Sequence, residues 1–396
     1  MRVLAILATS CFVSSMSMRI IDPVVPDIAR DLQVDTASVA MLASLYAFPY
    51  ALAQPVLGAF GDVFGKARII KIALAILAAC LAASAFAPTI TTLSLARLIG
   101  GAAAGGIIPL AFAIVGDQFA MSERQLALSR VLTAIIAGQL TGSIGSGFIA
   151  SFFGWRIATV AAAALTVLAF IITVWQLRPA PRPRPSEFRR GEFLDGYRAV
   201  FANPRSVVCF CAVFVEGIVI FGLFPYVAVL LEQRGAGGLK EAGLVLAGFG
   251  IGGFAYTALV RFMLGRLGFY RLIVAGGIVS GLGLVLLSVG TSWPAEMAIF
   301  MIVGIGFYMI HNSLQTQATE LAPFHRGSGV AAHSFFVFLG QAFGPIIYGV
   351  ALTSAGTLWT LIVAGSIMAL LGMATAWGLR ARSNLPLPEV VDPAAL

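Results

Sequence analysis

Charged residues are scarce in this chain. Asp, Glu, Lys and Arg together make up 11% of its 396 residues, whereas 59% are hydrophobic; an ordinary soluble domain carries about 25% charged residues. Cysteine and histidine are also few, with four and three residues, and their positions show no metal-ligand spacing. These shortages exclude a soluble globular protein, and we expect no metal site and no cofactor.

Long apolar stretches make up most of the sequence. A transmembrane helix needs about 20 predominantly apolar residues, and short polar loops separate twelve such stretches. We predict an all-α membrane protein with spans near 4–28, 38–59, 69–87, 91–118, 128–151, 156–177, 205–230, 241–262, 270–289, 295–319, 329–352 and 357–379. No room is left for a soluble catalytic domain, and the sequence has no H-E-x-x-H or G-x-S-x-G motif. An enzyme is therefore not expected.

The twelve predicted spans fall into two similar halves. Gly65 is echoed by Gly268 after 203 residues, and Gly154 by Gly356 after 202; Arg124 and Arg326 repeat at the same spacing. Such echoes favour a parallel repeat about an axis normal to the membrane. We predict six-helix bundles at 1–177 and 204–379, a proline-rich linker at 178–203 and a tail at 380–396. Within the linker, residues 187–201 are typical of a short amphipathic helix on the membrane surface.

The positions of the basic residues predict the orientation. If the N-terminus is cytoplasmic, 19 of the 25 Lys and Arg residues lie in inner loops and tails, and four lie in outer loops. This bias is a strong positive-inside signal. We therefore expect a multi-pass protein of the cell inner membrane with both termini in the cytoplasm. The net charge of +8 reflects this topology, so no nucleic-acid partner is expected.

Polar residues within the spans are unevenly distributed. The third, sixth, ninth and twelfth spans hold almost none beyond Ser and Thr, which is typical of helices that face lipid. The first, fourth, seventh, tenth and eleventh spans hold several, and ionisable groups persist in membranes where they line a watery cavity. We predict a central cavity shared by both halves, lined by Arg19, Asp22, Arg97, Glu216, His311, Asn312, Gln315, His333 and Gln341.

A glycine-rich basic stretch between the second and third spans reads Gly58-Ala-Phe-Gly-Asp62-Val-Phe-Gly65-Lys66-Ala-Arg68. It is similar to the G-x-L-x-D-x-x-G-R-K/R signature of the major facilitator superfamily, and the resemblance extends over essentially the whole chain. In that family this stretch acts as a conformational latch. The resemblance implies a conformational gate made by Gly58, Asp62, Gly65, Lys66 and Arg68. Asp117 lies at the inner end of the fourth span and is expected to be part of this gate.

Two further stretches resemble the twelve-helix drug:proton antiporter branch of this family. Leu93-x-x-x-Arg97 looks like the motif that carries a buried arginine associated with proton coupling. Gly138-x-x-x-Gly142 looks like the antiporter motif, but Ser143 stands where a proline is expected and Ser146 where a glycine is. This departure leaves the direction of exchange open.

Asp22, Arg97 and Glu216 are the predicted proton-coupling residues. At about 1.5 Å rise per residue, Asp22 and Arg97 lie at similar depth and could pair, although Arg19 lies one helical turn from Asp22 and competes for it. The pair could equally be a static ion pair that fixes helix packing. Glu216 lies near mid-bilayer with no base within a turn of its own helix, so burial disfavours its charged form. A neutral, hydrogen-bonded carboxylic acid is the alternative.

The predicted function is secondary active transport by alternating access, with proton-coupled export of drug-like or amphipathic organic compounds. The expected partners are a small-molecule substrate, protons and the lipid bilayer, and the chain is expected to be monomeric. One alternative is a proton symporter that takes up a small organic anion, with Arg19 and Arg97 binding its carboxylate. A more remote one is a membrane sensor that does not transport.

Overall fold

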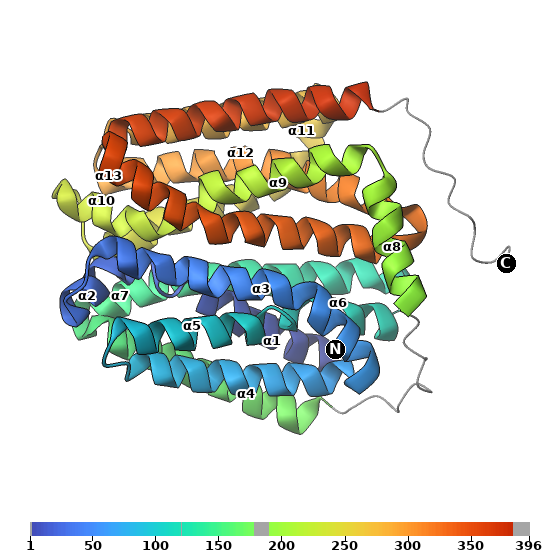
Figure 1. Ribbon diagram of the computed structural model, residues 1–396, viewed down its shortest axis with the longest axis horizontal. Helices are drawn as coiled ribbons and strands as arrows, with labels where there is room; N and C mark the ends of the chain where they lie inside the picture. Colours follow the sequence, from blue (N-terminus) through green and yellow to red (C-terminus); the bar gives the residue numbers. More distant parts are fainter. Residues whose placement is uncertain (1, 120, 178–189, 383–396) are drawn as a thin grey trace, which may run out of the picture.

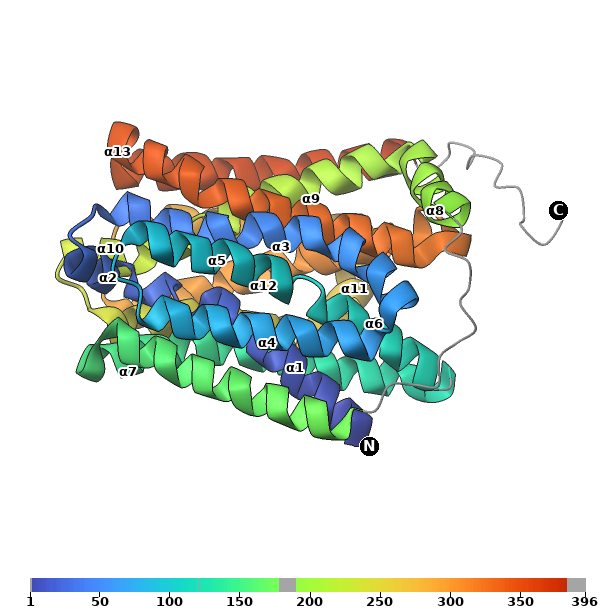
Figure 2. The same cartoon turned by 60° about the horizontal axis from the view of Figure 1, so that its bottom comes forward.

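The computed structural model describes residues 2–119, 121–177 and 190–382, and only the backbone at 58–63, 121, 122, 124, 125, 190–193 and 324. Long helices run side by side along one direction (Figures 1 and 2). The short helices α2 (Val25–Leu32) and α10 (Val227–Gln233) lie at one end of the bundle, and α8 (Arg190–Ala202) lies at the other. We name these ends the α2 side and the α8 side.

The described residues form helices throughout. In the first half these are α1 (Arg2–Arg19), the 3-10 turn η1 (Asp22–Val24), α2, α3 (Thr36–Phe64), α4 (Lys66–Ala85), α5 (Ile90–Ala104), α6 (Ile107–Gln118) and α7 (Met121–Gln176). After α8 come α9 (Arg205–Phe221), η2 (Phe224–Tyr226), α10, α11 (Leu239–Leu287), α12 (Trp293–Glu320), η3 (Pro323–His325) and α13 (Arg326–Ala381). The amphipathic segment predicted in the linker is helical from residue 190.

Three helices are long enough to cross a membrane twice. α7 and α13 have 56 residues each and α11 has 49, and each contains one glycine with non-helical backbone: Gly154 (φ 79°), Gly268 (φ 70°) and Gly356 (φ 74°). A positive φ is accessible to glycine at little cost, so the chain turns back there. Nine apolar helical stretches, three of them double, give the predicted twelve crossings within the part of the chain that the structure describes.

The glycine echoes in the sequence mark equivalent turns. Gly65 (φ 93°) ends α3 and Gly268 turns α11, while Gly154 and Gly356 turn α7 and α13. The spacing of 202–203 residues therefore corresponds to a repeated backbone conformation.

The first span of each half is broken at an equivalent place. α1, η1 and α2 follow one another with Pro23 at the break, and α9, η2 and α10 do so with Pro225, 202 residues later. Proline lacks the N–H that a continuous helix needs. η1 and η2 contact each other. Equivalent positions of two repeats can touch only near the axis that relates them, so the two breaks mark the centre of the molecule.

The four spans that are poor in polar residues carry large exposed apolar side chains. Trp175 (80% exposed) on the second part of α7, Val289 (73%) just after α11 and Trp377 (73%) on the second part of α13 are the clearest cases. Ile72 on α4 is also exposed. These helices cover the outside of the bundle, as the sequence predicts.

The two halves meet closely on the α2 side. Arg30 on α2 and Glu232 on α10 form an ion pair of 2.9 Å, and the backbones of α7 and α11 touch, because a Cβ added to Gly243 would lie 2.6 Å from the carbonyl oxygen of Ser143. Lys240 also lies 5.8 Å from the centre of the Phe148 ring. These contacts close this end of the space between the halves.

The helices diverge on the α8 side. None of residues 257–268 of α11 is buried, and the facing start of α7 buries only Ala127 and Val131 between residues 126 and 137. A helix packed against a neighbour has a buried face, so these two helix ends stand apart. The space between the halves is closed at the α2 side and open at the α8 side.

Candidate functional site

A buried ion pair lies at the central break of the first half. Arg19 is the last residue of α1 and Asp22 the first of η1. The Arg19 Nη1 is 3.4 Å from Asp22 Oδ2, and the two side chains are 6% and 1% exposed. Burying charges is costly unless they are paired and hydrogen-bonded, so this pair needs further partners.

The second half supplies those partners. The Arg19 guanidinium lies 4.6 Å from the centre of the Phe221 ring and 4.7 Å from that of Phe224, within cation–π range. The Gln341 amide is oriented so that its oxygen faces the donors of Arg19. This oxygen accepts from Arg19 Nη2 at 2.6 Å and from Nη1 at 3.1 Å. Arg19 and Phe221 are 202 residues apart, as are Asp22 and Phe224, so this cluster lies at the axis between the repeats.

Arg97 binds backbone instead of Asp22. Its Nη1 donates to the carbonyl oxygen of Ser17 at 2.8 Å, its Nη2 lies 3.5 Å from that of Met18, and its guanidinium is 4.0 Å from the centre of the Tyr46 ring. The last carbonyls of a helix attract cations, and α1 ends here. Of the two basic partners that the sequence offers Asp22, the structure selects Arg19, and the Asp22–Arg97 ion pair does not form; Arg97 acts on Asp22 only through space.

Glu216 has a base from another helix. Its Oε2 lies 3.1 Å from Nδ1 of His311 on α12, and none of the described residues bonds its Oε1. The His311 ring stacks on Phe307 at 4.8 Å and meets His333 of α13 edge-on at 4.9 Å. Glu216 is fully buried, whereas the side chain of His311 is 17% exposed. Both predicted histidines therefore belong to one cluster around Glu216.

Tyr308 lies between the two charged clusters. It interacts electrostatically with both Arg19 and Glu216, and with Gln139 and Ser143 of α7 and Phe224 it lines a narrow pocket beside Arg19. Phe224 carries no polar or motif signal that would have marked it in the sequence, whereas Gln139 is a polar residue within the Gly138-x-x-x-Gly142 stretch that the sequence prediction passed over. The spacing of 202 residues from Asp22 is the one feature that could have identified Phe224.

The remaining predicted cavity residues lie farther towards the α8 side. Asn312 is half-buried and hydrogen-bonds the Tyr256 hydroxyl group, and Gln315 is exposed. They lie one turn apart on α12, and their role in substrate binding stays a prediction.

The predicted gate is described only in part. Lys66 Nζ and Asp117 Oδ2 form an ion pair of 2.7 Å between α4 and α6 on the α8 side, and Arg68 is exposed nearby. Gly65 makes the turn that separates α3 from α4. Gly58 and Asp62 lie in the helical backbone of α3, but their side chains fall outside the described part, so the latch role of Asp62 stays a prediction.

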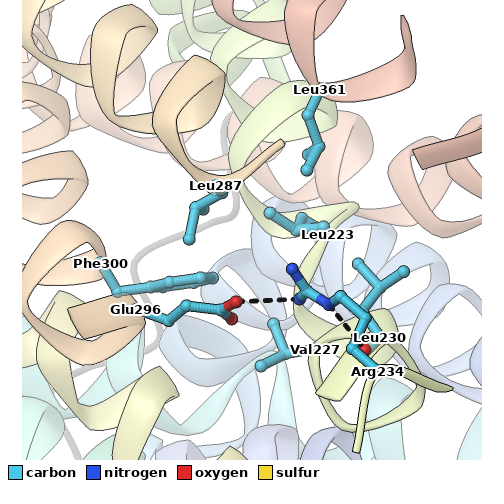
Figure 3. Close-up of a pocket in the computed structure, with 8 residues that line it drawn as sticks. All are labelled: Leu223, Val227, Leu230, Arg234, Leu287, Glu296, Phe300 and Leu361. Atoms are coloured by element: carbon cyan, nitrogen blue, oxygen red, sulfur yellow. Dashed lines mark hydrogen bonds and ion pairs between the residues drawn. The ribbon is translucent and has the colours of Figure 1, made fainter. Parts of the chain in front are cut away.

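A second ion pair, between the buried Glu296 and the partly exposed Arg234, lies at the α2 side (Figure 3). Arg234 Nη2 is 3.0 Å from Glu296 Oε1, and Arg234 Nε donates to the carbonyl oxygen of Leu230 at 2.9 Å. Leu223, Leu287 and Phe300 are among the apolar residues around it. The sequence places Arg234 in an outer loop and gives no role to Glu296. The pair fastens the end of α10 to α12 within the second half.

These features define a multi-pass α-helical membrane transporter with two repeats and charged residues buried on the axis between them. The chain belongs to the Major Facilitator Superfamily, whose family model matches residues 7–345 and 238–392. It is similar to Multidrug resistance protein 1 of Bacillus subtilis (25% identical, 87% of this chain and 88% of the relative). It is also similar to Multi-drug resistance efflux pump PmrA of Streptococcus pneumoniae (25%, 85% of each) and Quinolone resistance protein NorA of Staphylococcus aureus (25%, 87% and 88%).

The family confirms the resemblance and the fold predicted from the sequence. The chain is a secondary transporter of small-molecule substrates and not an enzyme.

Proposed function

We propose that this transporter exports drug-like or amphipathic organic compounds in exchange for protons. The observation that carries the proposal is the pair of buried charged clusters, Arg19–Asp22 and Glu216–His311, at the closed end of a space that opens on the α8 side. Buried carboxylates next to such a space are suited to bind and release protons. The names of the relatives, all drug-resistance proteins, support export of this substrate class.

The proposed orientation puts the α8 side in the cytoplasm of a cell whose inner membrane holds the protein. The basic residues support it, because Arg30, Arg156, Arg234 and Lys240 lie at the α2 side and most others do not. The conformation then faces inward, ready to accept substrate from the cytoplasm. Export follows when bundles 1–177 and 204–379 of one monomer rock about the central site, joined by the linker 178–203.

Uptake of an organic anion by proton symport is the second candidate, and the contacts of both arginines disfavour it. Arg19 is held by Asp22, Gln341 and two rings, and Arg97 by the end of α1 and Tyr46. Only Nε of each guanidinium group lacks a partner among the described residues, so a carboxylate that binds Nε together with an Nη atom would have to displace the partners named above, which lowers its net affinity.

The direction of proton movement tests the proposal. In proteoliposomes loaded with substrate on the side that the cytoplasmic face of the protein contacts, substrate that leaves should drive protons into that compartment. The compartment that loses substrate therefore becomes more acidic. A pH-sensitive dye and a panel of fluorescent organic cations, anions and neutral amphiphiles provide the measurement. Movement of protons with the substrate would establish symport and overturn the proposal.

Alternating access also predicts that the contact between Arg30 and Glu232 opens during transport. Because the pair is partly exposed, it contributes about 1 kcal/mol at most, so Arg30→Gln or Glu232→Gln should increase hydrogen–deuterium exchange in α2 and α10 by about fivefold or less. The double variant should exchange no faster than Arg30→Gln, because that change already removes the pair with Glu232, together with the weaker contact of Arg30 with Asp27 at 3.7 Å.

The matched control is Arg198→Gln, which breaks an exposed ion pair with Asp195 on α8. It should leave exchange in α2 and α10 unchanged. Additive effects of the Arg30 and Glu232 changes would contradict an interaction between them.

A further inference from the structure

The cluster around Glu216 contains an imidazole ring that can move a proton. His311 contacts the carboxylate through Nδ1, and of the two side chains only that of His311 is exposed to any extent. A fully buried acid can exchange protons with water only through a group that reaches both, or when the structure opens around it. His311 lies in that position, and His333, with 1% exposure, does not.

We propose that His311 is the residue through which Glu216 gains and releases its proton, which extends and rests on the proposed coupling function. When Glu216 is ionised, the neutral ring donates Nδ1–H to Oε2. A proton from water adds to Nε2, and the Nδ1 proton passes to Oε2. Glu216 is then neutral and donates its O–H to Nδ1, while the ring keeps a proton on Nε2. Release follows the same steps in reverse, so no proton or charge is left over.

The surroundings favour a relay over a permanent ion pair. Glu216 Oε1 has no partner among the described residues, so no further hydrogen bond stabilises a carboxylate charge at that atom. The stacked ring of Phe307 holds the His311 ring in one orientation, towards Oε2. Imidazole has distinct donor and acceptor nitrogens and can exchange their roles.

Titratable and charged groups from five helices lie in or around this relay. Cys209 of α9 and Tyr308 of α12 interact with Glu216 of α9, and His333 of α13 contacts His311. Farther out, Arg19 of α1 interacts with Tyr308, and Tyr256 of α11 hydrogen-bonds Asn312. Among these groups, His333 is the second imidazole in contact with His311. His333 is therefore the residue from which the role of His311 must be separated.

The test is a pH-jump infrared experiment on the full-length protein in lipid nanodiscs. The C=O stretch of the protonated carboxyl group that disappears in Glu216→Gln reports on Glu216. His311→Ala should slow the appearance of this band by about 100-fold, the usual contribution of a positioned proton-transfer group, while the final band intensity persists. Free imidazole added to His311→Ala should restore the rate, because it replaces the missing proton carrier.

His311→Asn tests the same point in a variant that keeps a hydrogen-bonding group beside Glu216 but has no second nitrogen that can carry a proton; it should also be slow. The distant His325→Ala is the control that should keep the rate, and His333→Ala tests the competing imidazole of the same cluster. An unchanged rate in both His311 variants, or imidazole rescue in His333→Ala instead, would overturn the relay. Loss of proton-coupled transport in Glu216→Gln would still stand in that case, whereas coupled transport by Glu216→Gln would contradict the coupling role of Glu216 on which the relay rests; proton exchange itself is tested by the direction of proton movement.

Discussion

Transport by the Glu216→Gln variant should lose its dependence on a proton gradient while the protein folds normally. Glutamine matches the shape of the neutral acid and can hydrogen-bond His311, so the packing of α9 against α12 should persist. It cannot bind or release a proton. We expect gradient-driven transport to fall by about 100-fold or more, while exchange of substrate down its own gradient continues.

Initial rates in proteoliposomes with and without an imposed pH gradient measure this effect, and thermal unfolding in detergent reports on folding. Glu320→Gln is the matched control, because Glu320 is an exposed acid at the end of α12 that lies 3.8 Å from Arg326. It should leave the response to the gradient intact. Transport by Glu216→Gln that keeps the pH dependence of the unaltered protein would contradict the coupling role.

The fold could be predicted from the sequence because its determinants are local. Apolar runs of membrane-spanning length give the twelve crossings, and the turns at Gly65, Gly154, Gly268 and Gly356 need a residue that tolerates positive φ. Their spacing of 202–203 residues also gives the repeat. Pro23 marks the break after α1, but only the structure pairs it with the break at Pro225.

The members of the site could be predicted, but not their partners. Depth along the helices allowed Arg97 to pair with Asp22, in competition with Arg19. In the structure, Arg97 instead binds the carbonyls that end α1. Glu216 and His311 are 95 residues apart, and which face of α12 meets α9 depends on how whole helices pack. Polar character draws attention to His311 and Gln341, but it cannot show that one serves Glu216 and the other Arg19.

Removing one member of the Arg19–Asp22 pair should destabilise the protein far more than removing both. Asp22→Asn leaves a buried guanidinium without its counter-ion, for which the expected cost is about 3–5 kcal/mol. Arg19→Met should cost less, because an isolated buried carboxyl group can take up a proton. The double variant has no buried charge at this position, so it should recover most of the stability lost in Asp22→Asn. Thermal unfolding of the four proteins measures this cycle.

Transport by the double variant separates a static pair from a functional one. The control is the ion pair of Arg234 and Glu296, where Glu296→Gln should cost less stability than Asp22→Asn, because the Arg234 side chain is 29% exposed and water can solvate its charge; the double variant Arg234→Met/Glu296→Gln completes the control. Since that pair lies within one half and away from the axis, its double variant should still transport with the original pH dependence. The Arg19–Asp22 double variant should fold and yet lose coupling, because Arg19 also contacts Phe221, Phe224 and Gln341 across the axis. Normal coupling in that variant would make the pair a fixed support for helix packing and leave Glu216 as the proton-binding acid.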